Sequence, residues 1–272
     1  MDSIRRNSLI NTMSRIPIIT TSLLLVFLCA CERFDVPQEP EPTDMVFTVM
    51  SVPMDSDLRT KAEAVTTSSL SSLKVTATRG EAGSETLYFG NKVFFRDGRW
   101  YKADVCWPTL DPNLHFYGSN VDMVFDADGT YINVSNADDV VTCTLFSPNI
   151  NAPNAMAMKH VLSRIHKITT VCTDGCEISD VCVRIIPKTG GKYNMRTDEW
   201  SNLVTGTSVT LSGTTLGTRE NDLCLVPGTY FLMASWTARK NGISKSYIDV
   251  SSRIVLSAGK SHNITVRLGN LE

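Results

Sequence analysis

Cys31 is the residue whose type and position most clearly indicate chemistry. It ends the motif Leu28-Cys29-Ala30-Cys31, which follows an uncharged apolar run over residues 16–30 and a basic start. This pattern is typical of a secretion signal, and the run is shorter than the about 20 residues of a membrane-spanning helix. A cysteine directly after the small residue predicts a lipoprotein, in which residues 1–30 are the signal peptide and Cys31 is lipidated.

Two alternatives stay open for this N-terminal region. Met13 could be the true start in place of Met1, because residues 13–30 already form a complete signal. The signal could also be an ordinary secretory one, in which Cys31 is incidental. Either version places the mature chain outside the cytoplasm. Residues 31–43, rich in Pro and Glu, then predict a solvated, flexible tether.

Thiol chemistry is the next possibility in the mature chain. Of eight cysteines, Cys29 leaves with the signal and Cys31 carries the lipid, so six remain: Cys106, Cys143, Cys172, Cys176, Cys182 and Cys224. An exported protein can oxidise such residues, but sequence alone does not resolve their pairing. Their spacing lacks the patterns of common zinc sites. We therefore expect one or two disulfides, or buried thiols, and no metal site.

Other catalytic patterns are missing. The four histidines show no metal-ligand spacing, and no nucleophile elbow or phosphate-binding loop occurs. His160 and His166 lie in an amphipathic run, where structural histidines are common. Asp126-Ala127-Asp128-Gly129 resembles half of a calcium loop, but a β-hairpin explains it better. We expect no catalytic residue, no cofactor and no enzymatic activity; a hydrolase is the weakest hypothesis.

The elements that must position these residues are β-strands. Apolar and polar residues alternate in several short runs, for example Leu73–Thr78 and His262–Leu268. The run Tyr230–Trp236 is apolar on both faces, which predicts a strand packed on two sides. We expect turns at the Gly-containing segments 96–99, 126–129, 189–192, 240–242 and 258–260. Many short strands and frequent turns predict β-sandwiches, with domains over residues 44–152 and 153–272.

Composition excludes some partners. The net charge of −2 with 20% charged residues gives no basic surface for nucleic acid.

The segment Met156–Ile168 fits either a helix or an extended strand. The four tryptophans are typical of strand cores, although exposed aromatic residues could also stack on sugars.

Several segments resemble the fimbrillin-like proteins of Bacteroidetes, the Mfa-like and major-fimbrium group that builds type V pili. These segments follow the lipoprotein signal in the family's order: Met45–Val49, Arg59–Ala62 with Leu70–Ala77, Lys102–Pro108, Leu114–Gly118, Lys159–Ile165, Leu223–Pro227 and Ala258–Ile264. The most specific is Lys159-His160-Val161-Leu162-Ser163-Arg164-Ile165, which is similar to the family's FKHALSRI motif. The resemblance spans nearly the whole mature chain.

This resemblance implies an all-β fold of two transthyretin-like β-sandwich domains, with Met156–Ile168 extended. It also implies assembly by donor-strand exchange: a protease cuts after an arginine, the first strand leaves, and another subunit's strand replaces it. Arg59 is the candidate cleavage site by position, and an uncut surface arginine is the alternative. We expect the first strand, over Val46–Met50, to lie at a border of its sheet.

The resemblance therefore predicts a fimbrial structural and adhesion subunit at the cell surface, anchored in the outer membrane through its lipid. Its partners would be other pilus subunits, and host or bacterial surface ligands. The chain ends directly after its last predicted strand, which favours an accessory or tip-like role over a stalk role. The alternative is a lipid-anchored surface protein that binds glycans or proteins and does not polymerise.

Overall fold

The structure, a computed structural model, consists of β-strands joined by turns and loops. It describes residues 44–51, 69–81, 84–97, 99–107, 114–135, 139–146, 148, 150 and 154–271. No helix occurs within these ranges. The all-β fold expected from strand alternation is therefore confirmed. Cys31 and Arg59 both lie outside the described residues, as do the signal peptide and the tether.

The first group of strands forms one eight-stranded sheet in the order β10-β8-β5-β2-β3-β4-β1-β9. The bounds are β1 (Asp44–Ser51), β2 (Ser72–Arg79), β3 (Thr86–Asp97), β4 (Arg99–Cys106), β5 (Leu114–Ser119), β8 (Val141–Leu145), β9 (Asn154–Ala157) and β10 (Lys159–His160). The two edge strands of this sheet, β9 and β10, are separated in the chain only by Met158. The sheet is therefore strongly curved, so that its two edges come close to each other. An apolar core fills its interior.

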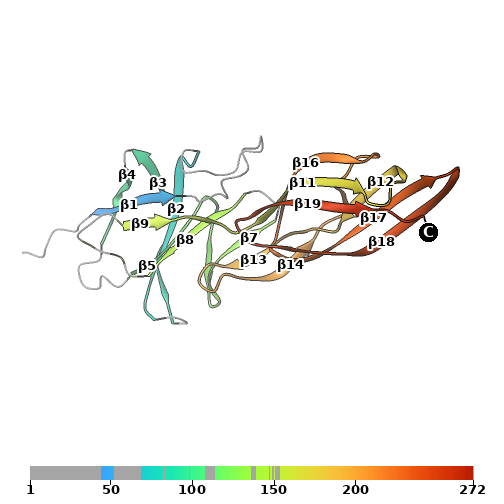
Figure 1. Ribbon diagram of the computed structural model, residues 1–272. Helices are drawn as coiled ribbons and strands as arrows, with labels where there is room; N and C mark the ends of the chain where they lie inside the picture. The colour runs from blue at the N-terminus through green and yellow to red at the C-terminus, as the bar shows by residue number, and fades with distance from the viewer. Residues whose placement is uncertain are drawn as a thin grey trace, which may run out of the picture. The chain divides into compact units, whose positions relative to one another are not determined.

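Strand β1 differs from its predicted place. It pairs antiparallel with β4 and parallel with β9, so it has a neighbour on both sides. Figure 1 shows β9 beside β1, on the side away from β4. The prediction of a border strand is wrong because β9, which follows more than a hundred residues later, covers the edge that the sequence of β1 alone leaves open.

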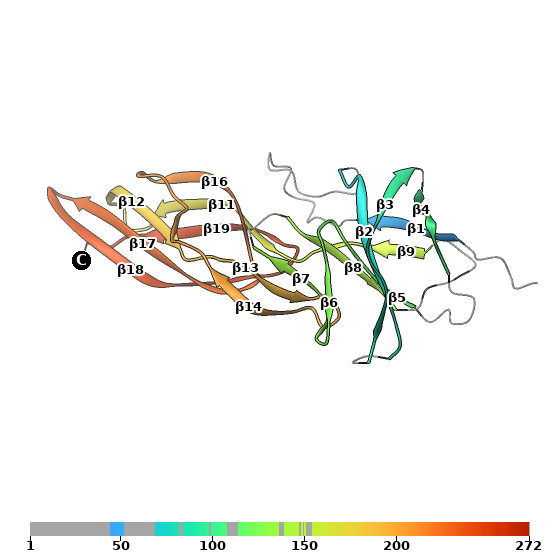
Figure 2. The ribbon, with the colours of Figure 1, turned by 180° about the vertical axis from the view of Figure 1, so that it is seen from behind.

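The C-terminal strands form a β-sandwich of two sheets, ordered β16-β11-β19 and β15-β12-β17-β18. The bounds are β11 (Ser163–Cys172), β12 (Glu177–Ile185), β15 (Val209–Thr210), β16 (Gly217–Leu225), β17 (Gly228–Lys240), β18 (Ile243–Leu256) and β19 (Ser261–Leu268). Figure 2 shows β16, β11 and β19 as one layer over β12, β17 and β18. A second apolar core lies between the layers.

A fourth sheet, ordered β14-β13-β7-β6, joins strands from both parts of the chain. Its bounds are β6 (Val124–Asp126), β7 (Gly129–Val134), β13 (Lys188–Asn194) and β14 (Glu199–Thr205). A third core packs beneath it and includes Tyr117, Ile132, Leu162 and Tyr193. The division into domains 44–152 and 153–272 stays a prediction, and strand pairs cross it at β1–β9, β8–β10 and β7–β13.

Most predicted turns are confirmed. Asn241 and Gly242 join β17 to β18 with φ values of 52° and 80°, as a tight hairpin of this type requires. The segment 126–129 is the β6–β7 hairpin. The turn expected at 189–192 is wrong, because these residues belong to β13. A side chain at Gly190 would collide with the carbonyl oxygen of Val134 in β7, so this glycine serves close strand packing.

Candidate functional site

The slot occupied by β1 in the first core is the main candidate site. Met45 and Phe47 of this strand are both fully buried. The Phe47 ring meets the edges of two other core rings, those of Phe94 and Phe116, with centroids 5.1 Å away in each case. Such edge-to-face pairs stabilise a core beyond simple burial. The N-terminal described strand therefore supplies side chains to the centre of the first core.

The backbone of β1 is held by two ladders. Phe47 lies opposite Trp100 of β4 and opposite Asn154 of β9. Each ladder contains one irregularity, between Asp44 and Val46 on the β4 side and between Val49 and Ser51 on the β9 side. Loss of β1 would leave an apolar slot flanked by unpaired backbone on both β4 and β9. A strand of similar sequence could satisfy both sets of groups.

Neither predicted site residue is brought to this slot by the described structure. Arg59 belongs to the connection between β1 and β2, and Cys31 precedes β1. Both assignments stay predictions. The structure adds that β1, the strand before this connection, has two fully buried side chains, Met45 and Phe47.

The Lys159–Ile165 motif joins the first sheet to the C-terminal sandwich. His160 Nδ1 lies 2.7 Å from Asp139, and the Ser163 hydroxyl donates to the carbonyl of Leu225 at 3.0 Å. Arg164 Nη2 lies 2.5 Å from Asp222. These polar groups hold the chain where it passes from β10 into β11. The expectation of an extended segment is confirmed. The histidine and the arginine of the motif each pair with an aspartate, which is a structural role.

A buried polar cluster lies beside this connection. The Glu85 side chain, only 5% exposed, pairs with His115 Nδ1 at 2.6 Å and with Arg196. The Tyr117 hydroxyl donates to the same carboxylate at 3.2 Å. Burial, followed by the charge of Glu85, raises the pKa of Tyr117 to about 12. The Arg196 guanidinium that pairs with this carboxylate also stacks on the Phe146 ring, and the Tyr117 ring meets Phe146 edge to face. Because the buried charge is matched and packed in this way, we interpret the cluster as a structural link.

Both carboxylates of the acidic hairpin 126–129 bind groups of the protein itself. The Tyr131 hydroxyl donates to Asp126 at 2.7 Å, and Lys192 Nζ lies 2.7 Å from Asp128. The Tyr131 hydrogen bond lowers the pKa of Asp126. The described residues contain no cluster of three metal-ligating side chains. They also include no helix that could cross a bilayer.

Sequence reasoning missed an exposed apolar face on the C-terminal sandwich. The strand over Tyr230–Trp236 was expected to pack on both sides, but only one face of β17 is buried. Phe231 is 62% exposed and Met233 is 39% exposed. The prediction is wrong because no layer among the described residues covers the outer face of the β15-β12-β17-β18 sheet. The neighbouring strand β18 is the edge of this sheet and also carries exposed apolar residues, including Ile248 and Val250.

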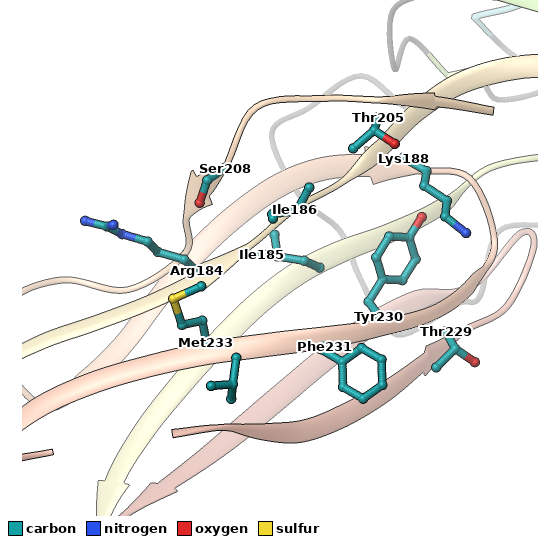
Figure 3. Close-up of a pocket in the computed structure, with 11 residues that line it drawn as sticks. Arg184, Ile185, Ile186, Lys188, Thr205, Ser208, Thr229, Tyr230, Phe231 and Met233 are labelled. Atoms are coloured by element: carbon teal, nitrogen blue, oxygen red, sulfur yellow. The ribbon is translucent and has the colours of Figure 1, made fainter. Parts of the chain in front are cut away.

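A pocket of about 300 Å³ opens on this face (Figure 3). Figure 3 shows Arg184 and Lys188 at opposite ends, with Phe231 and Met233 along one side. Four residues with hydroxyl groups also line the pocket: Thr205, Ser208, Thr229 and Tyr230. Among the described residues no acidic side chain lines the pocket, and the two charged residues in its lining, Arg184 and Lys188, are basic. The sequence did show apolar residues on both faces of this strand, and we interpreted them as buried on both sides.

Comparison with known proteins places these features in a family. The family described as fimbrillin-like matches residues 59–272. No curated protein gives a significant match to the chain.

Among solved structures, a candidate cell adhesion protein from Bacteroides ovatus has 13% sequence identity and a TM-score of 0.38, over 83% of this chain and 92% of that one. A candidate cell adhesion protein from Bacteroides thetaiotaomicron has 12% identity and a TM-score of 0.35, over 85% and 97%. The minor pilin of Streptococcus agalactiae has 12% identity and a TM-score of 0.30, over 74% and 84%. With TM-scores this low, the function of these proteins does not transfer to the chain. The match over residues 59–272, together with the all-β fold, shows that the chain belongs to the fimbrillin-like family.

Proposed function

We propose that this protein is a lipid-anchored fimbrial subunit, accessory or tip-like in role, whose β1 slot is its polymerisation site. The observation that carries the proposal is that β1, the N-terminal described strand, inserts two fully buried side chains, Met45 and Phe47, into the first core. Membership in the fimbrillin-like family supports a structural role in a pilus or in adhesion, without catalysis. Its partners are then other pilus subunits and surface ligands.

Assembly would proceed by strand exchange. Cleavage after Arg59 would cut the only covalent connection between β1 and the strands that follow it. Because β1 pairs on both sides, it would leave only as another subunit's strand takes over its two ladders. The incoming strand must also supply apolar side chains at the positions of Met45 and Phe47. This requirement predicts selectivity for strands with large apolar residues two positions apart.

An arginine-specific protease tests this step. The wild-type protein should be cut once between β1 and β2 and then form oligomers that resist mild denaturation. Arg59→Ala should stay uncut in that connection and monomeric. Arg33→Ala is the matched control, because Arg33 precedes β1 in the tether and its removal should leave polymerisation unchanged. Clean cleavage at Arg59 that yields only monomers would exclude polymerisation by this route.

A synthetic peptide with the sequence of Asp44–Ser51 sharpens the same test. In excess, it should refill the slot of the cleaved protein and suppress oligomers. A Phe47→Asp version of the peptide should not compete, because a carboxylate in an apolar core is strongly unfavourable. Equal inhibition by both peptides would show that the slot is not the exchange site.

Lipidation at Cys31 supplies the outer-membrane anchor in this proposal, after removal of the signal peptide 1–30. Each buried methylene contributes about 0.8 kcal/mol of membrane affinity, so several acyl chains hold a protein stably. Cys31→Ser should abolish labelling with radioactive palmitate and release the protein from the membrane fraction. Cys29→Ser should leave both unchanged, since Cys29 is removed with the signal.

A second candidate function is ligand binding by a lipoprotein that does not polymerise. The observation that favours it is the pocket with Arg184, Lys188 and exposed Phe231. An aromatic ring can stack on the apolar face of a sugar, while basic and hydroxyl groups bind its polar edge. A pocket of this volume lies at the small end of the range for ligand sites, so it suits one ring of an acidic glycan.

Binding to an array of neutral and acidic glycans tests this alternative. Phe231→Ala should abolish retention of an acidic glycan, and Arg184→Gln should weaken it at least tenfold if the ligand carries a carboxylate. Val255→Ala is the matched control, because Val255 is equally exposed on the sheet but does not line the pocket. Absence of any retained glycan would exclude glycan binding by this pocket.

A further inference from the structure

Two thiols face each other where β11 leads into β12. Cys172 is the last residue of β11, and Cys176 directly precedes β12. Their Sγ atoms are 3.4 Å apart. The three residues between them form a sharp bend, in which Gly175 has a φ of 62° that glycine adopts without strain. A disulfide needs sulfur atoms about 2.05 Å apart, so a small side-chain adjustment would bring them to bonding distance.

The surroundings of these two thiols also suit oxidation. Both side chains are partly exposed, so a reagent can reach them. Burial opposes ionisation of Cys172, but hydrogen bonds from the Asp174 backbone and the Cys176 thiol outweigh it and lower its pKa. Burial and the neighbouring Cys172 raise the pKa of Cys176. Cys172 is therefore the better nucleophile, since the thiolate is the reactive form.

Another cysteine gives the contrast. Cys143 is 2% exposed within the first core, and burial raises its pKa to about 12. A thiol in such a place stays protonated and out of reach of an oxidant.

We propose that Cys172 and Cys176 form a disulfide in the exported protein by exchange with a disulfide-bearing oxidant. The Cys172 thiolate attacks one sulfur of the oxidant and displaces its other sulfur as a thiolate. The Cys176 thiolate then attacks Cys172 in the mixed disulfide and displaces the second thiolate. The protein loses two protons and two electrons, and the oxidant's disulfide becomes two thiols. Formation in the cell depends on export, which is part of the proposed function.

The bond would fix the loop that holds the C-terminal end of the chain. The Thr173 N–H donates to the carbonyl of Leu268 at 3.0 Å, at the end of β19. The Asn270 N–H donates to the Asp174 carboxylate at 2.6 Å. Lys240 Nζ donates to the Asp174 carbonyl at 3.2 Å, which ties the β17–β18 hairpin to the same loop. The disulfide therefore acts as a local clamp on the last strand.

Peptide mapping without reductant tests the pairing on the full mature protein. Free thiols are first blocked with iodoacetamide, and the protein is then digested with trypsin and with a protease that cleaves before aspartate. Cleavage after Lys167 and before Asp174 and Asp180 puts Cys172 on residues 168–173 and Cys176 on residues 174–179. The two peptides stay joined only by the disulfide. Cys182→Ser should preserve the joined pair, and Cys176→Ser should abolish it.

The same mapping separates the pairing from export. Protein from the cell envelope should carry the joined peptides, and so should purified protein equilibrated with oxidised and reduced glutathione. Joined peptides after equilibration alone would support the pairing and contradict export. Alkylation of both cysteines in both samples would overturn the pairing.

Hydrogen exchange tests the clamp itself. Reduction, or Cys176→Ser, should make the Asn270 amide exchange roughly tenfold faster, because the loop that accepts its hydrogen bond can open locally. Amides in the first sheet, far from the loop in the chain, should not change. An unchanged Asn270 rate in a protein that carries the disulfide would show that the bond does not hold the C-terminal end.

Discussion

The slot of the first sheet and the outer face of the C-terminal sandwich use the same residue type in opposite ways. Phe47 is fully buried and touches two core rings, whereas Phe231 is 62% exposed beside a pocket. In the slot, an apolar strand completes a core and could be replaced by a similar strand. On the outer face, the apolar side chains are exposed and belong to no core within the described structure. The first arrangement suits polymerisation, and the second suits ligand binding.

The largest expected effect comes from the slot. Phe47→Ala should lower the free energy of unfolding by about 3–5 kcal/mol, because it removes a buried ring and leaves a cavity between Phe94 and Phe116. Urea denaturation followed by tryptophan fluorescence measures the change. A loss below about 1 kcal/mol would show that β1 is not an integral part of the first core.

The seam between β7 and β13 should be the next most sensitive place. Gly190→Ala puts a methyl group against the Val134 carbonyl and should cost about 1–3 kcal/mol through overpacking. Gly213→Ala is the control, since a methyl group there meets nothing within 4 Å. The same denaturation curves measure both. Equal losses of stability in the two variants would show that Gly190 is not needed for close packing of β13 on β7.

Alkaline pH should weaken the protein through its buried tyrosines. The pKa of Tyr117 is raised to about 12 by burial and Glu85, and burial raises that of Tyr230 to about 12. An unfolded tyrosine loses its proton near pH 10, so the stability is complete below pH 10 and falls as the pH rises toward 12. Tyr117→Phe should make this fall shallower in urea midpoints taken from pH 9 to 12.

Tyr230→Phe extends the pH experiment to the C-terminal sandwich. If the two regions unfold together, both substitutions should flatten one common transition. If they unfold separately, each should affect only its own transition. A pH dependence that neither substitution changes would mean that other groups govern alkaline unfolding.

Much of the fold could be predicted from local sequence. The Asn241-Gly242 hairpin follows from residues that tolerate positive φ, and the half-buried β19 follows from alternation at Ile264, Val266 and Leu268. These features depend only on near neighbours in the chain. The same reasoning placed Gly190 in a turn. That prediction failed because this glycine instead allows close packing of β13 against β7, a strand that is distant in sequence.

The candidate sites were harder to predict because each depends on contacts between strands that are distant in the sequence. The sequence of β17 identifies Phe231 and Met233 as apolar positions but does not show whether another layer covers them. The sequence of β1 likewise does not show that β9 returns to pair with it. Proximity of Cys172 and Cys176 was within reach of sequence, but the orientation of their sulfur atoms toward each other was not.

The smallest expected effect belongs to the outer face, and it tests the comparison most directly. Phe231→Ser should change the free energy of unfolding by no more than about 0.5 kcal/mol, because its ring is already largely in water. A surface that folding does not need, yet carries exposed apolar side chains around basic groups, is typical of a binding site. If Phe231→Ser instead destabilises the protein as much as Phe47→Ala does, the outer face is a core surface, and its apolar residues are explained by folding rather than by a ligand.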